Sequence, residues 1–244
     1  MAMAAMQQAV DWLLAPLSGA ADHGLEPWAY WHARLMVLSW SLLLPLGSLV
    51  ARFFKVTRRQ DWPRVLDNQL WFRAHLWGQS LGVAVMTLGV ALALANAGGT
   101  TPAASAHHWF GWIVAALGWA QIAAALGRGV KGGPTYVTMR GDHYDMTPRR
   151  IAFEYVHKSL GWIALLLAIP ATGLGLWIAD APRWMPLTLA LWWALMIAGF
   201  VVLQRQGRCF DTYQAIWGPD PVHPGNRRKP IGWGVRRVEA DRGG

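Results

Sequence analysis

The chain has 244 residues, 54% of them hydrophobic and only 14% charged, where an average soluble protein has about 25% charged residues. This composition predicts an integral membrane protein. The net charge of +9 does not indicate a nucleic-acid-binding protein, because the basic residues lie between apolar segments. The single cysteine, Cys209, excludes an internal disulfide and a four-thiolate metal site.

The N-terminal stretch has apolar residues at helical spacing between positions 3 and 17. No Lys or Arg precedes Arg34, so we expect no cleavable signal peptide, which would need a positive start. The stretch is expected either to lie as a short helix in the membrane interface or to dock on a partner subunit.

Five apolar segments follow, each of about the 20 residues that a membrane-spanning helix needs: 28–54, 69–96, 106–127, 150–178 and 183–204. The predicted fold class is all-α, an integral membrane bundle of five transmembrane helices, four of which form the core. We expect an external N-terminal segment (1–26), a transmembrane domain (27–205) and a basic, irregular tail (206–244).

The basic residues predict the orientation in the membrane. Most of the 22 Lys and Arg residues lie in the first and third connections between spans and in the tail, whereas connections 97–105 and 179–182 hold none. The positive-inside rule therefore predicts an external N-terminus and a cytoplasmic C-terminus, in a bacterium across the inner membrane. The long connection 132–147 carries His143 between two aspartates and is expected to be either functional or a solvated connector.

Four histidines lie on four consecutive spans at two matching depths. His32 and His107 stand near the outer ends, and His75 and His157 stand about two turns from the inner ends. Ionisable side chains inside a bilayer are costly and therefore indicate function. Two imidazoles per level, with almost no carboxylate, suit a bis-histidine haem iron better than tetrahedral zinc. His108 competes with His107, although it points about 100° away.

Glycines beside these histidines leave room for a planar ligand. Gly78 and Gly82 follow His75 on its own helix face, and Gly111 and Gly161 each stand four residues after a histidine. The alternative is that the glycines only let helices approach closely, which we favour for the first two.

Polar side chains occur at both levels. Arg34, Arg73 and Lys158 could pair with haem propionates or merely reach the membrane surface. Gln121 stands 14 residues after His107, on nearly the same face, and is expected to hydrogen-bond near the inner haem or to another helix.

These residues resemble the cytochrome b561 family over about residues 28–205. The four histidines stand in WHARLMVLSWSLLLPLGSLVAR, WFRAHLWGQSLG, HHWFGWIVAALGWAQ and VHKSLGW, in the family's order. The resemblance implies two b-type haems, one bound by His32 with His107 and the other by His75 with His157. It also implies electron transfer from ascorbate on the cytoplasmic side to an external acceptor such as ferric iron.

The chain departs from the family's pattern in two ways. We expect neither the extra helix that precedes the first histidine in ascorbate-type members nor a DOMON domain. A quinol donor and a partner redox protein as acceptor therefore stay open. A second interpretation is a haem-bearing anchor or accessory subunit of a larger membrane complex, or a homodimer. The nearly all-apolar middle of the spans argues against a transporter.

Overall fold

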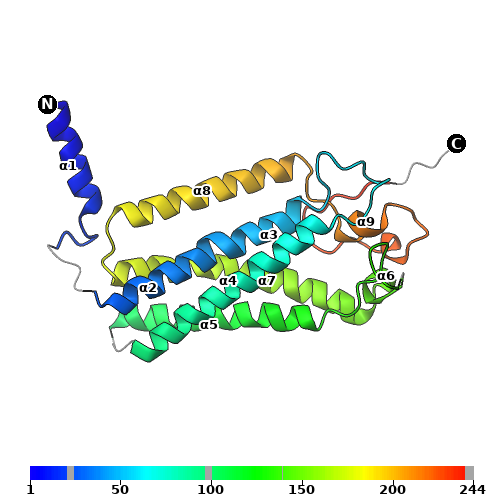
Figure 1. Ribbon diagram of the computed structural model, residues 1–244, viewed down its shortest axis with the longest axis horizontal. Helices are drawn as coiled ribbons and strands as arrows, with labels where there is room; N and C mark the ends of the chain where they lie inside the picture. The colour runs from blue at the N-terminus through cyan, green and yellow to red at the C-terminus, as the bar shows by residue number, and fades with distance from the viewer. Residues whose placement is uncertain (21–24, 97–100, 139, 240–244) are drawn as a thin grey trace.

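The structure is a computed structural model that describes residues 1–20, 25–96, 101–138 and 140–239 (Figure 1). Its elements are α1 (Ala2–Leu14), α2 (Pro27–Met36), the π-helical turn η1 (Val37–Leu43), α3 (Leu44–Phe53), α4 (Gln69–Asn96), α5 (Pro102–Leu126), α6 (Asp142–Asp145), α7 (Pro148–Ile178), α8 (Trp184–Arg205), α9 (Thr212–Trp217) and the 3-10 turn η2 (Pro224–Arg227). Within those residues five helical segments are long and apolar enough to cross a membrane: α2–α3 taken together, α4, α5, α7 and α8. The predicted all-α membrane bundle is confirmed.

Two of the spans begin earlier than expected because of their caps. The Thr101 side chain accepts a hydrogen bond from Ala104 N at 3.2 Å, and α5 starts at Pro102 rather than at 106. Thr147 accepts one from Arg150 N at 3.4 Å, and α7 starts at Pro148. In both helices a hydroxyl at the N-cap satisfies a free amide, and the proline that follows has no amide to satisfy.

The first span stays helical through Pro45 by way of a π turn. In a regular α-helix Ser41 O would accept from the amide of residue 45, which a proline lacks. Leu44 N instead donates to Ser39 O, five residues back, and Ser41 O accepts from Trp192 Nε1 at 2.7 Å. The π turn therefore leaves a free carbonyl that forms a polar contact between the first span and α8. No residue of α8 is buried.

The four histidine-bearing spans form two closely packed pairs. The first pair is α2–α3 with α4, and the second is α5 with α7. The pairs meet in a buried apolar layer at mid-height, made by Trp40, Leu44, Val83 and Met86 of the first pair and Val114, Ala115, Ala164, Ala168 and Ala171 of the second. This layer, which we call the middle layer, separates the two ends of the bundle.

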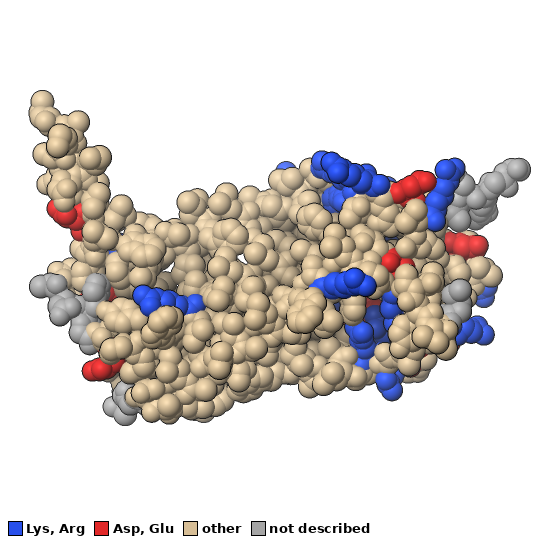
Figure 2. All heavy atoms as spheres, viewed as in Figure 1, with Lys and Arg blue, Asp and Glu red and all other residues tan. Residues whose placement is uncertain are grey.

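The two ends differ in charge. Figure 2 shows Lys and Arg gathered over the end where α3 and α5 finish and α4 and α7 begin, while the visible middle carries no charged side chain. We call this end, together with α9 and the residues after it, the basic end. The uncharged band between the ends is what the hydrocarbon core of a bilayer requires.

The described part of the tail has little regular structure beyond α9 and η2, yet it is packed on the bundle. After α8 the chain folds back over the basic end, where Tyr213, Ile216, Trp217 and Ile231 pack on Trp71 and Met146. Asp211 N donates to Arg236 O at 2.9 Å, and the Asp211 carboxylate accepts from Arg237 Nε at 2.6 Å. The aromatic residues of α9, too few to show a helical period, are buried by contacts that lie far apart in the sequence.

Candidate metal centres and the cavity at the basic end

One pair of histidines faces across the bundle at the end opposite the basic end. The ring centroids of His32 on α2 and His107 on α5 lie 6.1 Å apart, with the ring planes at 85°. His32 Nδ1 lies 2.9 Å from Gly89 O, and His107 Nδ1 lies 2.9 Å from Ala171 O. Each imidazole is thus held by a backbone carbonyl of the other helix in its own pair.

The second pair repeats this arrangement at the basic end. The ring centroids of His75 on α4 and His157 on α7 lie 6.2 Å apart, with the ring planes at 84°. His75 Nδ1 lies 3.1 Å from Gly47 O, which stands 15 residues after His32 on the first span. At 1.5 Å per residue the two levels are about 22 Å apart.

Both pairs have the spacing of two imidazoles that bind one metal ion. Two metal–nitrogen bonds of about 2 Å and two ring radii of about 1.2 Å place the ring centroids about 6.4 Å apart. Among the described residues no group of three or more His, Cys, Asp and Glu side chains could hold a metal ion. The pairs therefore suit an ion whose other ligands come from a macrocycle, as in haem.

The carbonyl contacts determine which ring nitrogen is free. A carbonyl oxygen can only accept, so Nδ1 of His32, His75 and His107 carries the proton and Nε2 keeps its lone pair. This is the usual outer hydrogen bond of a metal-binding histidine, which sets the tautomer and the ring orientation.

The contact to His157 is different in kind because it comes from the Gln121 side chain. One polar atom of that amide lies 2.6 Å from His157 Nδ1, and the other lies 3.1 Å from Gly161 N. With its NH₂ group towards the ring the amide donates to Nδ1, whereas with its oxygen towards the ring it accepts from Nδ1–H. The second orientation would free Nε2 for a metal, but it turns the amide oxygen towards His157 O and the NH₂ group towards Gly161 N, whereas the first satisfies all three contacts.

The glycines divide into two groups. A Cβ on Gly82 would meet Leu44 Cδ2 at 2.6 Å, and a Cβ on Gly78 would lie 3.6 Å from Gly47 Cα, so both serve close packing of α4 on α3. A Cβ on Gly111 would meet nothing within 4 Å, and one on Gly161 would meet only Gln121. The open space thus lies one turn after His107 and one turn after His157.

A further glycine beside the histidines was missed by the sequence analysis. A Cβ on Gly175 of α7 would approach His107 Cε1 to 3.0 Å, so this position leaves room for the imidazole of the neighbouring helix. It stands four residues after Ala171, the residue whose carbonyl holds His107.

The basic side chains expected at the two levels lie away from the imidazoles. Arg34 lies over the Trp31 ring at 5.0 Å and is exposed, as is Arg73. Each stands two residues from a histidine, which puts it on the far side of the helix. Lys158 donates to Glu154 Oε2 at 2.6 Å and to Ile231 O at 2.9 Å.

The structure also distinguishes the two adjacent histidines that could have stood opposite His32. His107 faces His32, whereas His108 is exposed and its Nε2 accepts from Trp112 Nε1 at 2.8 Å.

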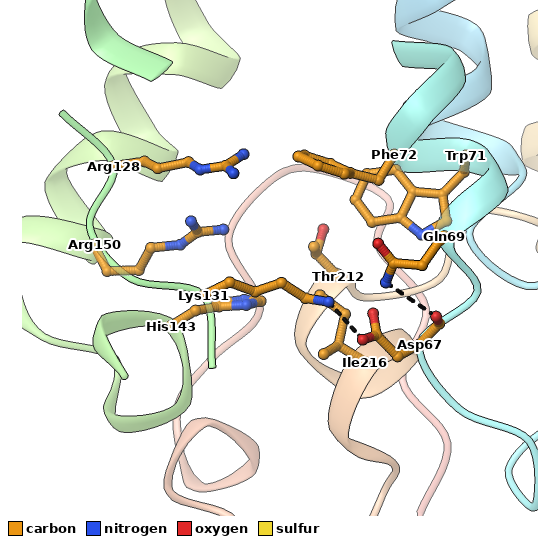
Figure 3. A pocket seen from close by; sticks show the side chains of 10 residues that line it. All are labelled: Asp67, Gln69, Trp71, Phe72, Arg128, Lys131, His143, Arg150, Thr212 and Ile216. Atoms are coloured by element: carbon orange, nitrogen blue, oxygen red, sulfur yellow. Dashed lines mark hydrogen bonds and ion pairs between the residues drawn. The ribbon is translucent and has the colours of Figure 1, made fainter. Parts of the chain in front are cut away.

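Beyond the inner histidine pair, the basic end contains a small, partly open cavity of about 40 Å³ (Figure 3). Its lining comes from four parts of the chain: Asp67, Gln69, Trp71 and Phe72; Arg128 and Lys131; His143 and Arg150; Thr212 and Ile216. Figure 3 shows the guanidinium groups of Arg128 and Arg150 extended towards Phe72, with the hydroxyl of Thr212 between the two sides. The cavity therefore offers charged donors beside a flat aromatic wall.

The two arginines were missed as site residues, although the sequence holds a signal for them. Arg150 stands seven residues before His157 on the same face of α7, and Arg128 stands seven residues after Gln121, just beyond the end of α5. Arg128 lies 4.8 Å over the Phe72 ring and has no ion-pair partner within the described residues. Arg150 Nε donates to Glu154 Oε1 at 3.1 Å.

His143 of α6 lines the same cavity and is fully buried. Its Nε2 lies 3.5 Å from Glu154 Oε1, which is too long for a strong hydrogen bond, and neither ring nitrogen has a hydrogen-bond partner in the part of the chain described. Burial first, and then the charges of Arg150, Lys158 and Lys131, hold the pKa of His143 well below its usual value, against the opposing effect of Glu154.

This depressed pKa predicts a loss of stability in mild acid. The unfolded chain takes up a proton at this histidine near pH 6.5 and the folded chain does not, so stability is fully present above that pH and falls below it. We expect the melting temperature of the purified protein in detergent to drop between about pH 7.5 and about pH 5.5, and His143→Phe to reduce that drop. An unchanged drop in the variant would contradict this assignment.

Comparison with known proteins shows what the chain as a whole is similar to. No family model and no solved structure matches the chain. The chain is 29% identical over 170 residues to a cytochrome b561, DM13 and DOMON domain-containing protein of Arabidopsis thaliana, which covers 70% of this chain and 17% of the relative. It is 28% identical over 145 residues to ferric-chelate reductase 1 of Homo sapiens, which covers 59% of this chain and 22% of the relative. The chain spans about a fifth of the length of these relatives. The predicted resemblance to the cytochrome b561 family is confirmed.

Proposed function

From this homology to cytochrome b561 proteins, we propose that the chain is a transmembrane di-haem b-type cytochrome that passes electrons across the membrane. The observation that carries the proposal is the repetition of one arrangement at two levels. Two imidazole pairs with ring separations of 6.1 and 6.2 Å lie on either side of a buried apolar layer.

In this function the histidines bind iron and the carbonyls orient them. His32 with His107 would hold one haem, and His75 with His157 the other. When bound, the haems supply one-electron redox chemistry, and their potentials depend on the ligands, on burial and on the hydrogen bonds to the ligands. Three backbone carbonyls take no part in the redox chemistry, but they keep the imidazoles of His32, His75 and His107 in the tautomer whose Nε2 can bind a metal. These carbonyls belong to Gly89, Gly47 and Ala171.

The middle layer determines what can cross. Trp40 stands eight residues after His32 and seven before Gly47, so it lies about halfway between the levels. The layer has no charged member, and Met86 within it is completely buried. A charged ion would have to be desolvated to pass, whereas an electron can tunnel between the two sites.

The cavity at the basic end is the place that we propose for the electron donor. Arg128 and Arg150 present guanidinium groups, and a planar anion could lie against Phe72 and Trp71. Guanidinium groups bind carboxylates and enolates through paired hydrogen bonds, which favours ascorbate over a neutral quinol. By the positive-inside rule this end lies in the cytoplasm. The similarity to ferric-chelate reductase 1 makes ferric iron the first acceptor to test at the other end.

The test is spectroscopic and uses the full chain in lipid vesicles. We expect a b-type spectrum with two haems per chain, reduction by ascorbate added at the basic end, and reoxidation by a ferric chelate at the other end. A preparation that contains no haem while its helices remain intact would refute the proposal. Reduction by a quinol but not by ascorbate would move the donor from the cavity to the membrane.

Two arginines that each stack on an aromatic ring provide a matched pair of variants for the donor site. Arg128→Gln removes a cation at the cavity, and Arg34→Gln removes one at the opposite end. Loss of a charged hydrogen bond of about 1.5–3 kcal/mol predicts a rise of about 10- to 100-fold in the KM for ascorbate in Arg128→Gln only. Equal effects in both variants would refute the assignment of the cavity.

A further inference from the structure

Helix α1 (Ala2–Leu14) lies outside the bundle and has no buried residue. Figure 1 shows it crossing the direction of the spans, beside the end where α2 begins. A helix in that position has no bundle surface to cover, yet its large side chains are apolar. The exposed fractions of Met3, Met6, Val10, Trp12 and Leu14 range from 42 to 81%. Exposed apolar surface on one element indicates an interaction site.

The apolar and polar residues of α1 lie on different faces. Met3, Met6, Val10 and Leu13 follow one another at helical spacing and form a stripe. Gln7 and Asp11 stand on another face, where Gln7 Nε2 donates to Asp11 Oδ1 at 2.9 Å. This is the pattern of a helix with one face in an apolar medium and the other in water.

The turn between α7 and α8 holds α1 at this level. Leu17 N donates to Ala181 O and Arg183 N donates to Ala15 O, both at 3.1 Å. The Arg183 guanidinium lies 5.0 Å over the Trp12 ring. This turn joins two membrane spans, so it lies where the bilayer meets water, and α1 is fastened to it.

We infer that α1 lies in the plane of the membrane interface, with the Met3–Met6–Val10–Leu13 stripe in lipid and the Gln7–Asp11 face in water. Three observations favour lipid over a protein partner. The helix runs across the spans, it is fastened at the level where they end, and its polar face carries a single charged side chain. The inference is independent of haem and of electron transfer. It gives α1 the role of an interfacial anchor.

The experiment places a nitroxide label at single positions of the full chain in phospholipid nanodiscs. The one native cysteine, Cys209, is buried, so engineered cysteines react selectively. The variants are Met6→Cys and Val10→Cys on the stripe, and Gln7→Cys and Asp11→Cys on the polar face. The references have nearly equal exposure: Leu88→Cys at 62% on a membrane span and Val222→Cys at 61% on the tail.

The readout is the ratio of collisions with oxygen, which dissolves in lipid, to collisions with a water-soluble nickel chelate. We expect Met6 and Val10 to match Leu88, and Gln7 and Asp11 to match Val222. Water-like ratios at all four positions would place α1 in solution. Immobile labels that neither reagent reaches on the stripe would identify a protein contact. Either of these results would overturn the inference.

Discussion

His75→Ala is expected to remove one haem from each chain and to leave the other in place. The variant would delete one of the two imidazoles proposed to hold the inner haem, while His32 and His107 lie about 22 Å away and keep their own partners, Gly89 and Ala171. The reduced-minus-oxidised band should fall to about half, because one of two bis-histidine centres is lost. Haem extracted per chain measures the same quantity independently.

Combinations of variants test which histidines belong to the same haem site. His157→Ala should have the same effect as His75→Ala, and the double variant should lose no more than either single one, since both belong to one centre. His32→Ala added to His75→Ala should abolish the spectrum. His108→Ala should keep both haems, because His108 is engaged with Trp112. Loss of a haem in His108→Ala, or of both in His75→Ala, would refute the pairing.

Glu154→Ala is expected to destabilise the basic end strongly. The carboxylate is buried and lies 3.1 Å from Arg150 Nε, 2.6 Å from Lys158 Nζ and 3.5 Å from His143 Nε2. Removing it leaves the buried Arg150 without its ion-pair partner, and breaking a buried pair costs about 3–5 kcal/mol; the half-buried Lys158 keeps its bond to Ile231 O. Denaturant unfolding in detergent, followed by tryptophan fluorescence, measures the loss.

An exposed ion pair provides the control. Asp61 lies 3.7 Å from Arg64, and both side chains are largely exposed. Such pairs contribute about 0–1 kcal/mol, so Asp61→Ala should change the free energy of unfolding by no more than that. Equal losses in Asp61→Ala and Glu154→Ala would show that the buried cluster around Glu154 is not a stabilising element.

The way the four spans pair predicts how haem binding would affect the stability of the bundle. Each helix pair brings one histidine to each level, and at each level the two facing histidines come from different helix pairs. Between the levels, the pairs touch mainly through the middle layer. Bound haem would therefore tie the two halves together at two points, and the halves should separate more easily when one point is lost.

Much of this protein follows from local properties of the sequence. A bilayer requires about 20 apolar residues per span, so hydropathy alone identified five spans. A straight helix converts residue number into depth at 1.5 Å per residue, so the two levels of histidines could also be predicted. Their pairing as His32 with His107 and His75 with His157 came from the family resemblance, and the ring separations support it.

Other features depended on contacts between distant segments. In the sequence, nothing about charge distinguishes Arg128 and Arg150 from the other basic residues. The structure identifies them as site residues because both line the cavity where α4, α5 and α7 converge. Arg34, Arg73 and Lys158, chosen for depth, lie elsewhere because depth does not determine which side of a helix faces the centre.

The sequence by itself determined the number of spans, the depth of the histidines and the asymmetry of charge, because each depends on composition and on the regular rise of a helix. Only the tertiary structure decided that the tail covers the basic end, that Trp192 satisfies the carbonyl which Pro45 leaves free, and that Gln121 rather than a carbonyl holds His157. These features are hydrogen bonds and packing between residues far apart in the chain, and their partners are chosen by the three-dimensional arrangement of the helices.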